Sequence, residues 1–442
     1  MEPKKQTIII VLVAVLVTAG IAVGVTYVLV APPPEGATDE LEIYHWWTSG
    51  GEAAAVGALV DVFKDLYPTT IVKQRAISGG SGITMIPIIT ALILAGEAPD
   101  AFQMHAGYEG IEYFKADLLD DINDIWTDNN LETVIPDVVQ SMCQFDGDYY
   151  MVPVNIHRSN VVWYNLKELE ALTPAIDPKT LTNWTAFFDA CIAFEAENPG
   201  KDAISLGQAW TQAHLFEQIL AGEGIAVYED WINGDIISGT DPDLLAALTI
   251  LETFMTYTND DFNTITWNDA TDLLIQNNSI FNVMGDWANG EFLLANSVYD
   301  DDYGTIAVPG TGDMYGLVVD AFQHPAGVAH PKNSDRWLEV VASKEGQDAF
   351  NPLKGSISAR TDSNLALYGP YHDWTFADFE SVTYMFPSVV HGSGAPQSFS
   401  SELSSVINAF CTGGATKAET AIAIAALASE NAADFTTVWS LD

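Results

Sequence analysis

Strand-like and helix-like stretches alternate along the chain from Glu40 onward. The strand pattern appears in LEIYHWW (41–47) and IVKQRAI, and EAAAVGALVDVFKDLYP between them has apolar residues at helical spacing. A second apolar helix (84–95) and a short strand, DAFQMH (100–105), follow. This β-α-β pattern predicts an α/β fold with a parallel sheet, because parallel strands need a long connection between them. Ligand groups are expected at the carboxyl ends of these strands.

The rest of the chain predicts a second lobe. The stretch DGDYYMVPVNIHRSNVVWYN is typical of a turn flanked by strands, and we expect the chain to cross between lobes near 150–155. A mostly helical region follows it. The strand-like run YGTIAVPG (303–310) and a helix around 334–343 then resemble the first lobe again, and 355–442 is rich in helix. The 442 residues are enough for one large two-lobed architecture.

The composition excludes several classes of protein. Hydrophobic residues make up 48% and aromatic residues 11% of the chain, which excludes a disordered or collagen-like protein. The 60 acidic residues outnumber the 16 Lys and Arg, and the formal charge of -44 repels phosphate backbones. Nucleic acid is therefore excluded as a partner. Such a surface suits an acidic or a salty medium, and composition does not choose between them.

The N-terminal segment predicts a membrane anchor. Lys4 and Lys5 precede an uncharged apolar run of 24 residues, Thr7–Val30. As a helix it would span about 36 Å, enough for a hydrocarbon core of about 30 Å, whereas the apolar region of a cleaved signal peptide has only about 7 to 15 residues. The positive-inside rule places Met1 in the cytoplasm and the bulk outside the cell. Residues 31–40, APPPEGATDE, are then a short tether.

The cysteines give no sign of a metal or redox centre. Cys143, Cys191 and Cys411 are far apart in sequence and form no CxxC pair, so neither a zinc knuckle nor a thioredoxin-like motif is present locally. They allow at most one disulfide and one free thiol. We expect no metal site and no cofactor.

Aromatic and planar polar residues cluster near the ends of the first strands. Trp46 and Trp47 end the first strand, and a Gly-rich turn after them leads to Glu52 at the start of a helix. Gln103 and His105 alternate along a later strand, which puts both on one face. Aromatic faces with planar polar groups are what a sugar ring requires. Alternatively, one Trp belongs to the core and Glu52 only complements the helix dipole.

A second set of such residues lies further along the chain. Asn155, His157 and Arg158 fall at the expected crossing between lobes. Asp286 and Trp287 form a Gly-Asp-Trp turn after an apolar strand, where they would present a carboxylate beside an aromatic platform. An Asp in a turn is more commonly a local cap.

Seven motifs in one order carry a resemblance to a known family. The chain resembles the family 1 extracellular solute-binding proteins of carbohydrate ABC importers, closest to glucose/mannose-binding members, over nearly all of 40–442. The resemblance implies a two-lobed clamp in which the chain crosses between lobes three times. The motifs are WWTSGGE, PDAFQMHAG, VPVNIHRSNVVWYN, AWTQAHLFE, FNVMGDWANG, PLKGSISARTD and VVHGSGAP.

The resemblance also implies a division of the chain and a set of sugar-binding residues. A transmembrane helix and tether (1–35) would precede lobe 1 (36–152 plus 303–350) and lobe 2 (153–302 plus 351–442), with crossings near 150–155, 296–304 and 346–356. Trp231 could equally be core. The implied residues are Trp46, Trp47, Glu52, Gln103 and His105 from the first lobe; Asp286, Lys354 and His391 from the second lobe or hinge; Trp210 and Trp231 as a stacking platform; and Asn155 and His157 at the hinge.

The expected function is that of a membrane-tethered extracellular sugar-binding protein without catalytic residues. It would capture a neutral monosaccharide such as glucose or mannose by hinge closure and deliver it to the permease subunits of an ABC importer. Alternatives are a binder of short oligosaccharides and an anchored receptor for sensing or adhesion. An extracellular glycosidase that uses Glu52 and Asp286 is the least favoured, because no local catalytic signature accompanies the pair.

Overall fold

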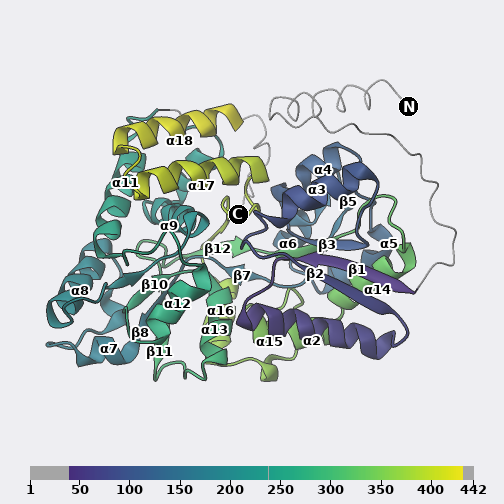
Figure 1. The fold of residues 1–442 in the computed structure, drawn as a ribbon, viewed down its shortest axis with the longest axis horizontal. Helices are drawn as coiled ribbons and strands as arrows, with labels where there is room; N and C mark the ends of the chain where they lie inside the picture. The colour runs from purple at the N-terminus through teal and green to yellow at the C-terminus, as the bar shows by residue number, and fades with distance from the viewer. Residues whose placement is uncertain (1–38, 237, 432–442) are drawn as a thin grey trace. The chain divides into compact units, whose positions relative to one another are not determined.

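Two separate β-sheets with helices packed around them organise the part of the chain that the computed structural model describes, residues 39–236 and 238–431 (Figure 1). Each sheet has its own apolar core. The predicted two-lobed α/β fold is therefore confirmed. The apolar run Thr7–Val30 and the tether up to Thr38 lie outside the described residues. Among the helices that the structure does describe, none combines the length and hydropathy needed to cross a membrane.

The first lobe is built on a five-stranded sheet of order β2-β1-β3-β13-β6. Strand β1 pairs in parallel with β2 and β3, and β13 runs antiparallel between β3 and β6. Alternate residues of β1 are buried, as its pattern predicts for a strand with one face on a core. The strands are β1 (Glu40–His45), β2 (Ile71–Ala76), β3 (Ala101–His105), β13 (Asp320–Gln323) and β6 (Met151–Pro153).

Helices pack on both faces of this sheet. Helix α2 buries Val56, Leu59, Val60 and Phe63, the apolar residues whose spacing predicts it, and packs along α15 (Figure 1). The elements are α2 (Gly50–Leu66), α3 (Met85–Ala95), α4 (Ile111–Lys115), α5 (Asn123–Asp128), α6 (Asp137–Met142), α14 (Pro331–Ala342) and α15 (Lys344–Lys354), with 3-10 turns at Tyr108–Gly110 and Leu131–Thr133 and a hairpin of β4 (Gln144–Phe145) and β5 (Asp148–Tyr149).

The second lobe has a four-stranded sheet of order β11-β8-β10-β9 and most of the remaining helices. The strands are β8 (Val161–Asn165), β9 (Ile204–Ser205), β10 (Phe281–Val283) and β11 (Tyr303–Ala307). The helices are α7 (Leu166–Ala171), α8 (Trp184–Glu197), α9 (Ala209–Gly222), α10 (Ile225–Ile232), α11 (Pro242–Phe254), α12 (Trp267–Ile275), α13 (Asn289–Leu294), α16 (Pro370–Ser381), α17 (Gln397–Cys411) and α18 (Lys417–Asn431), with 3-10 turns at Pro178–Thr180, Met255–Tyr257, Asp286–Ala288 and Leu365–Leu367.

A small three-stranded sheet connects the lobes. Its order is β14 (Tyr384–Pro387), β12 (Met314–Val318) and β7 (His157–Arg158), and it lies between the two larger sheets (Figure 1). The chain first passes from β6 in one sheet to β8 in the other through β7. It returns through β12, from β11 to β13. These short strands form the hinge.

Two of the three crossings lie later in the chain than expected. Strand β11 pairs along its whole length with β8, so residues 303–307 belong to the second lobe, and the second crossing falls at 308–319 instead of 296–304. Residues after α15 still contact the first lobe, since Thr361 N donates to Val134 O. Asn364 N also donates to Asp348 Oδ1 of α15, so the third crossing follows 364, and not 346–356. The strand pairing, which sequence patterning does not reveal, decides both positions.

The three cysteines are all free thiols, and Cys143 and Cys191 lie buried in the cores of different lobes. Burial raises the pKa of Cys143 and Cys191, and that of Cys411 to about 12. They are packing residues, and no disulfide links the lobes in the described part of the chain.

Candidate ligand site between the lobes

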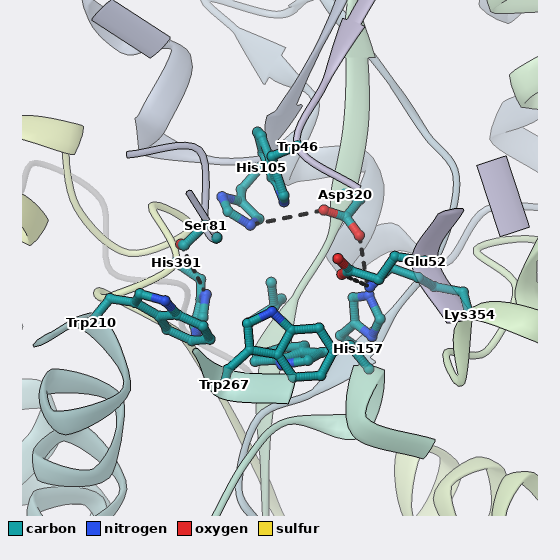
Figure 2. A pocket seen from close by; sticks show the side chains of 13 residues that line it. Trp46, Glu52, Ser81, His105, His157, Trp210, Trp267, Asp320, Lys354 and His391 are labelled. Carbon is teal, nitrogen blue, oxygen red and sulfur yellow. Dashed lines mark hydrogen bonds and ion pairs between the residues drawn. The ribbon is translucent and has the colours of Figure 1, made fainter. Parts of the chain in front are cut away.

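A cavity lies between the two lobes and beside the hinge (Figure 2). The space that protein atoms leave free there, counted together with the part that opens to solvent, is about 350 Å³. The cavity is lined by Trp46, Glu52, Gly80, Ser81, His105, His157, Trp210, Trp267, Trp287, Val318, Asp320, Lys354 and His391.

The first lobe supplies an aromatic wall of Trp46 and His105. Trp46 directly follows β1, and its backbone N–H donates to Gln103 Oε1 at 3.1 Å on the neighbouring strand. The ring centroids of Trp46 and His105 are 4.8 Å apart. Glu109 orients the imidazole by accepting from the His105 backbone N–H at 2.6 Å and lying 3.1 Å from Nδ1. The Nε2 atom of His105 is thereby directed toward the cavity side, where Asp320 lies 3.8 Å away (Figure 2).

An ion pair closes one end of the cavity. Lys354 is the last residue of α15, Glu52 is in the first turn of α2, and the packing of these two helices brings Nζ to 2.8 Å from Oε1. Both side chains are more than nine-tenths buried. Because each charge is neutralised by the other, the pair can donate to and accept from a ligand without leaving an unpaired buried charge. Lys354 Nζ also lies 5.9 Å from the centre of the Trp287 ring.

Asp320 and His157 form a chain of buried charges through the hinge. Asp320 Oδ1 accepts from Gln103 Nε2 at 2.9 Å, and Oδ2 accepts from Asn155 Nδ2 at 2.8 Å and lies 3.1 Å from His157 Nε2. On its other side His157 Nδ1 is hydrogen-bonded to Asp286. One imidazole thus links a first-lobe strand to the Asp286 turn of the second lobe.

The electrostatics of this chain favour a charged imidazole between two carboxylates. Burial lowers the pKa of His157, but the negative charge of Asp286 opposes it and the net shift is upward. Burial alone would raise the pKa of Asp320, yet the hydrogen bond and charge of His157 hold it well below its usual value. Asp320 therefore faces the cavity as a carboxylate.

Tryptophans of the second lobe form the wall opposite Trp46. Figure 2 shows Trp210 and Trp267 across the cavity from Trp46 and His105. The ring centroids of Trp210 and Trp287 are 6.3 Å apart. Helix α9 presents Trp210, α12 presents Trp267, and the turn after β10 presents Trp287. An apolar disc between these rings and Trp46 would be stacked from both lobes.

His391 closes the end of the cavity opposite the ion pair. Its Nδ1 lies 3.2 Å from Ser81 Oγ of the first lobe, and its Nε2 lies 3.1 Å from Nδ1 of His214. Its ring centroid is 4.9 Å from that of Trp287. Burial and the neighbouring imidazoles hold the pKa of His391 well below its ordinary value. Burial also lowers the pKa of His214 to about 3, so both rings are neutral hydrogen-bonding groups.

A family pattern matches most of the chain that forms these walls. It describes the bacterial extracellular solute-binding proteins and matches residues 47–348. A protein of Pyrococcus horikoshii named as an uncharacterized ABC transporter extracellular-binding protein is 38% identical over 86% of both chains. The chain belongs to the bacterial extracellular solute-binding proteins. The family resemblance carried by the seven motifs is confirmed.

Other relatives of this solute-binding protein carry sugar names. A xylose/arabinose-binding protein of Haloferax volcanii is 26% identical over 80% of this chain and 76% of its own. Among solved structures, a chitin oligosaccharide binding protein superposes with a TM-score of 0.77 at 17% identity, covering 90% of this chain and all of the other. At this identity the structural likeness shows the shared two-lobed fold.

Of the residues expected to touch the ligand, seven line the cavity: Trp46, Glu52, His105, His157, Trp210, Lys354 and His391. Gln103, Asn155 and Asp286 lie one layer behind it. The first two donate to Asp320, and Asp286 binds His157 and accepts from the Arg158 backbone N–H at 2.9 Å. These three residues belong to the site, but their polar atoms orient other side chains and do not line the cavity.

Trp47 and Trp231 lie in the cores instead of the cavity. Trp47 packs against Phe322 and Phe350 of the first lobe, with ring centroids 5.9 and 4.8 Å away. Trp231 is fully buried beside Tyr228 in the second lobe. Neighbouring residues in extended backbone point to opposite faces, so of Trp46 and Trp47 only one can reach the cavity. The expectation that these two side chains contact the ligand is wrong for this structure.

Several residues that line the cavity are not predicted from the sequence. Trp287 is one of them: of the pair Asp286 and Trp287 it is the tryptophan that faces the cavity. Ser81 lies in the Gly-rich loop Gly79–Gly82, where three glycines have positive φ. This run of glycines is the sequence feature that could have indicated a loop at the site. Asp320 and Trp267 have no local motif. Gly80 and Val318 complete the lining. In the described residues no group of His, Cys, Asp and Glu is arranged to hold a metal ion.

Proposed function

We propose that this solute-binding protein captures a neutral sugar of monosaccharide size, glucose or mannose first among them, and delivers it to the permease of an ABC importer. The observation that carries the proposal is a small cavity with tryptophans on both lobes and paired charges at its edge. Sugar rings present apolar C–H faces to aromatic rings and hydroxyls to carboxylates and amines. The xylose/arabinose-binding relative supports a sugar as the ligand class, and so does a glucose-binding protein of Saccharolobus solfataricus that is 25% identical over 70% of this chain and 59% of its own.

The charges of the cavity favour a neutral ligand. Lys354 is neutralised by Glu52, and His157 lies between Asp320 and Asp286. An anionic ligand would need a cation that has no protein partner, because an unbalanced buried charge is strongly unfavourable. Hydroxyl groups can instead share the donors and acceptors of these pairs. A sugar epimer that leaves one such group unpaired would bind roughly 10- to 100-fold more weakly.

Capture would proceed by closure about the hinge strands. Contacts between lobes flank the cavity: Gly51 N donates to Glu291 Oε1 at 3.2 Å on one side, and Glu109 N donates to Gly392 O at 2.8 Å on the other. These contacts can form only when the lobes are together. A bound sugar that touches both walls would stabilise this arrangement, which is the state that the permease would recognise.

The sugar class is tested by titrating the full-length protein in a detergent without a sugar headgroup. We expect one of D-glucose, D-mannose, D-galactose, D-xylose, maltose and cellobiose to quench Trp fluorescence saturably and to raise the thermal midpoint. At 100 times Kd a ligand adds about 2.7 kcal/mol of stability. The quench should be lost in Trp287→Phe and kept in Trp231→Phe, whose ring lies in the core.

The other outcomes of the titration separate the alternatives. If no sugar changes the fluorescence or the thermal midpoint, the proposal is contradicted. A response only to maltose or cellobiose without products favours the oligosaccharide alternative. Release of glucose from a disaccharide identifies a glycosidase instead.

We also propose that the apolar run Thr7–Val30 tethers the protein to the outer face of the membrane. The full-length chain should then stay in the membrane pellet after washing with alkaline carbonate, whereas a chain that starts at residue 36 should be released. Recovery of the full-length chain in the supernatant would contradict the tether. A shortened mature N-terminus in mass spectrometry would identify a cleaved signal peptide.

A further inference from the structure

A single buried carboxylate on α9 holds the segment that leads to His391. Glu217 is fully buried and accepts hydrogen bonds from five donors. Its Oε1 accepts from the backbone N–H groups of Val389 at 2.5 Å and Val390 at 3.2 Å, and from the Tyr228 hydroxyl at 2.9 Å. Its Oε2 accepts from Ser388 Oγ at 2.7 Å and from Gln218 Nε2 at 3.2 Å.

The same helix also holds the ring of His391. His214 lies one turn before Glu217 on α9, and its Nδ1 is 3.1 Å from His391 Nε2. The Ser388 hydroxyl, which donates to Glu217, accepts from the His391 backbone N–H at 3.2 Å. Helix α9 therefore fixes both the backbone that precedes His391 and the direction of its imidazole. The position of His391 is not set by regular secondary structure, since residues 388–396 lie between β14 and α17.

We propose that Glu217 is a positioning residue of the ligand site: it places His391 at the end of the cavity by tying residues 388–390 to α9. This inference rests on the proposed function of the cavity. The segment also touches the first lobe, because Ser81 Oγ lies 3.2 Å from His391 Nδ1 and Glu109 N donates to Gly392 O. Glu217 thus supports a ligand contact and a contact between lobes.

The geometry separates this role from simple packing. Both backbone amides point to one oxygen, Oε1, so a neutral amide at position 217 can still accept from them. Burial raises the pKa of Glu217 to about 7, opposed by its hydrogen bonds, and a protonated carboxyl also keeps one accepting oxygen. A leucine of similar size has no acceptor, so the Val390 amide loses its partner and the Val389 amide keeps only the Tyr228 hydroxyl at 3.3 Å. Glu217→Leu and Glu217→Gln therefore differ chiefly in whether residue 217 offers an acceptor to the backbone amides.

The test uses the full-length protein and D-glucose, with hydrogen exchange at the Val389 and Val390 amides as a readout that needs no ligand. In Glu217→Leu we expect faster exchange at both amides and about 10- to 100-fold weaker glucose binding. Glu217→Gln should restore slow exchange and most of the affinity. Glu223→Leu, at the half-buried C-cap of the same helix, is the matched control and should change neither.

Unchanged exchange and affinity in Glu217→Leu would overturn the positioning role, and so would equal losses in the leucine and glutamine variants. If Glu217→Leu does not fold, Ser388→Ala decides: we expect faster exchange at the His391 amide and weaker glucose binding, and no change in either overturns the proposal. Failure of the wild-type protein to bind glucose counts against glucose as the ligand, while the exchange data still report whether Glu217 holds the segment.

Discussion

The variant Asp320→Asn is expected to bind its sugar at least about 100-fold more weakly than the wild-type protein. The wild-type carboxylate accepts from Gln103, Asn155 and His157 and faces the cavity. An asparagine presents an NH₂ group to one of these donors, so at least one buried pair is lost. It also removes one of the two carboxylates beside the imidazole of His157, which then has Asp286 alone. Isothermal titration with the sugar that binds the wild-type protein measures the effect.

The matched control for this variant is Asp313→Asn. Asp313 is an exposed carboxylate in the turn before β12, in the crossing segment that leads to Asp320. We expect it to leave affinity unchanged, which shows that one lost negative charge is not the cause. Thermal midpoints of both variants separate loss of the site from loss of the fold. Wild-type affinity in Asp320→Asn would show that Asp320 does not contact the ligand.

Acidification from about pH 7.5 to about pH 4 is expected to remove several kcal/mol of stability. Burial lowers the pKa of His45 and His372 to about 4 and that of His214 to about 3, from an ordinary value of 6.5. These rings stay neutral in the folded protein, while the unfolded chain takes up protons below pH 6.5. Their contribution is fully present above pH 6.5 and is lost as the pH falls toward 4.

Two fully buried groups, Glu217 and His157, act in the opposite direction. The pKa of Glu217 is raised to about 7, so its contribution is present below its ordinary value of 4.5 and is lost as the pH rises through 7. The pKa of His157 is also raised, so its contribution is present below 6.5 and is lost as the pH rises through its value in the folded protein. His391 has a lowered pKa and acts with His45, His214 and His372. These four histidines outweigh Glu217 and His157, and the net slope is toward lower stability in acid. Urea midpoints followed by circular dichroism at fixed salt measure this slope.

The variant His45→Gln provides a control, because glutamine cannot take up a proton in this range. Its urea midpoint should fall less steeply with acidification than that of the wild-type protein. A wild-type midpoint that stays constant down to about pH 4 would show that the histidines do not titrate as their burial implies. The result also bears on the acidic surface: strong acid sensitivity favours a salty medium over an acidic one.

The order of strands and helices in the first lobe could be predicted from sequence because each depends on local spacing. Leu41 and Ile43 alternate with half-buried residues in β1, and the buried apolar stripe of α2 ends at Phe63, in the last turn of the helix. Gln103 and His105 were placed on one face by the same period of two, and both lie near Asp320. Burial along one element is a local property, so its pattern is visible in a single segment.

Which strands and side chains lie next to each other is decided by contacts between distant parts of the chain. Asp320 meets Asn155, 165 positions away, because β13 lies between β3 and β6. The pairing of β11 with β8 likewise moves the second crossing to 308–319. The sequence alone thus determined the α/β lobes, the family and the types of residue in the site. Which tryptophans enter the cavity and which carboxylate faces it depend on packing between segments, since no local period records what lies opposite a side chain.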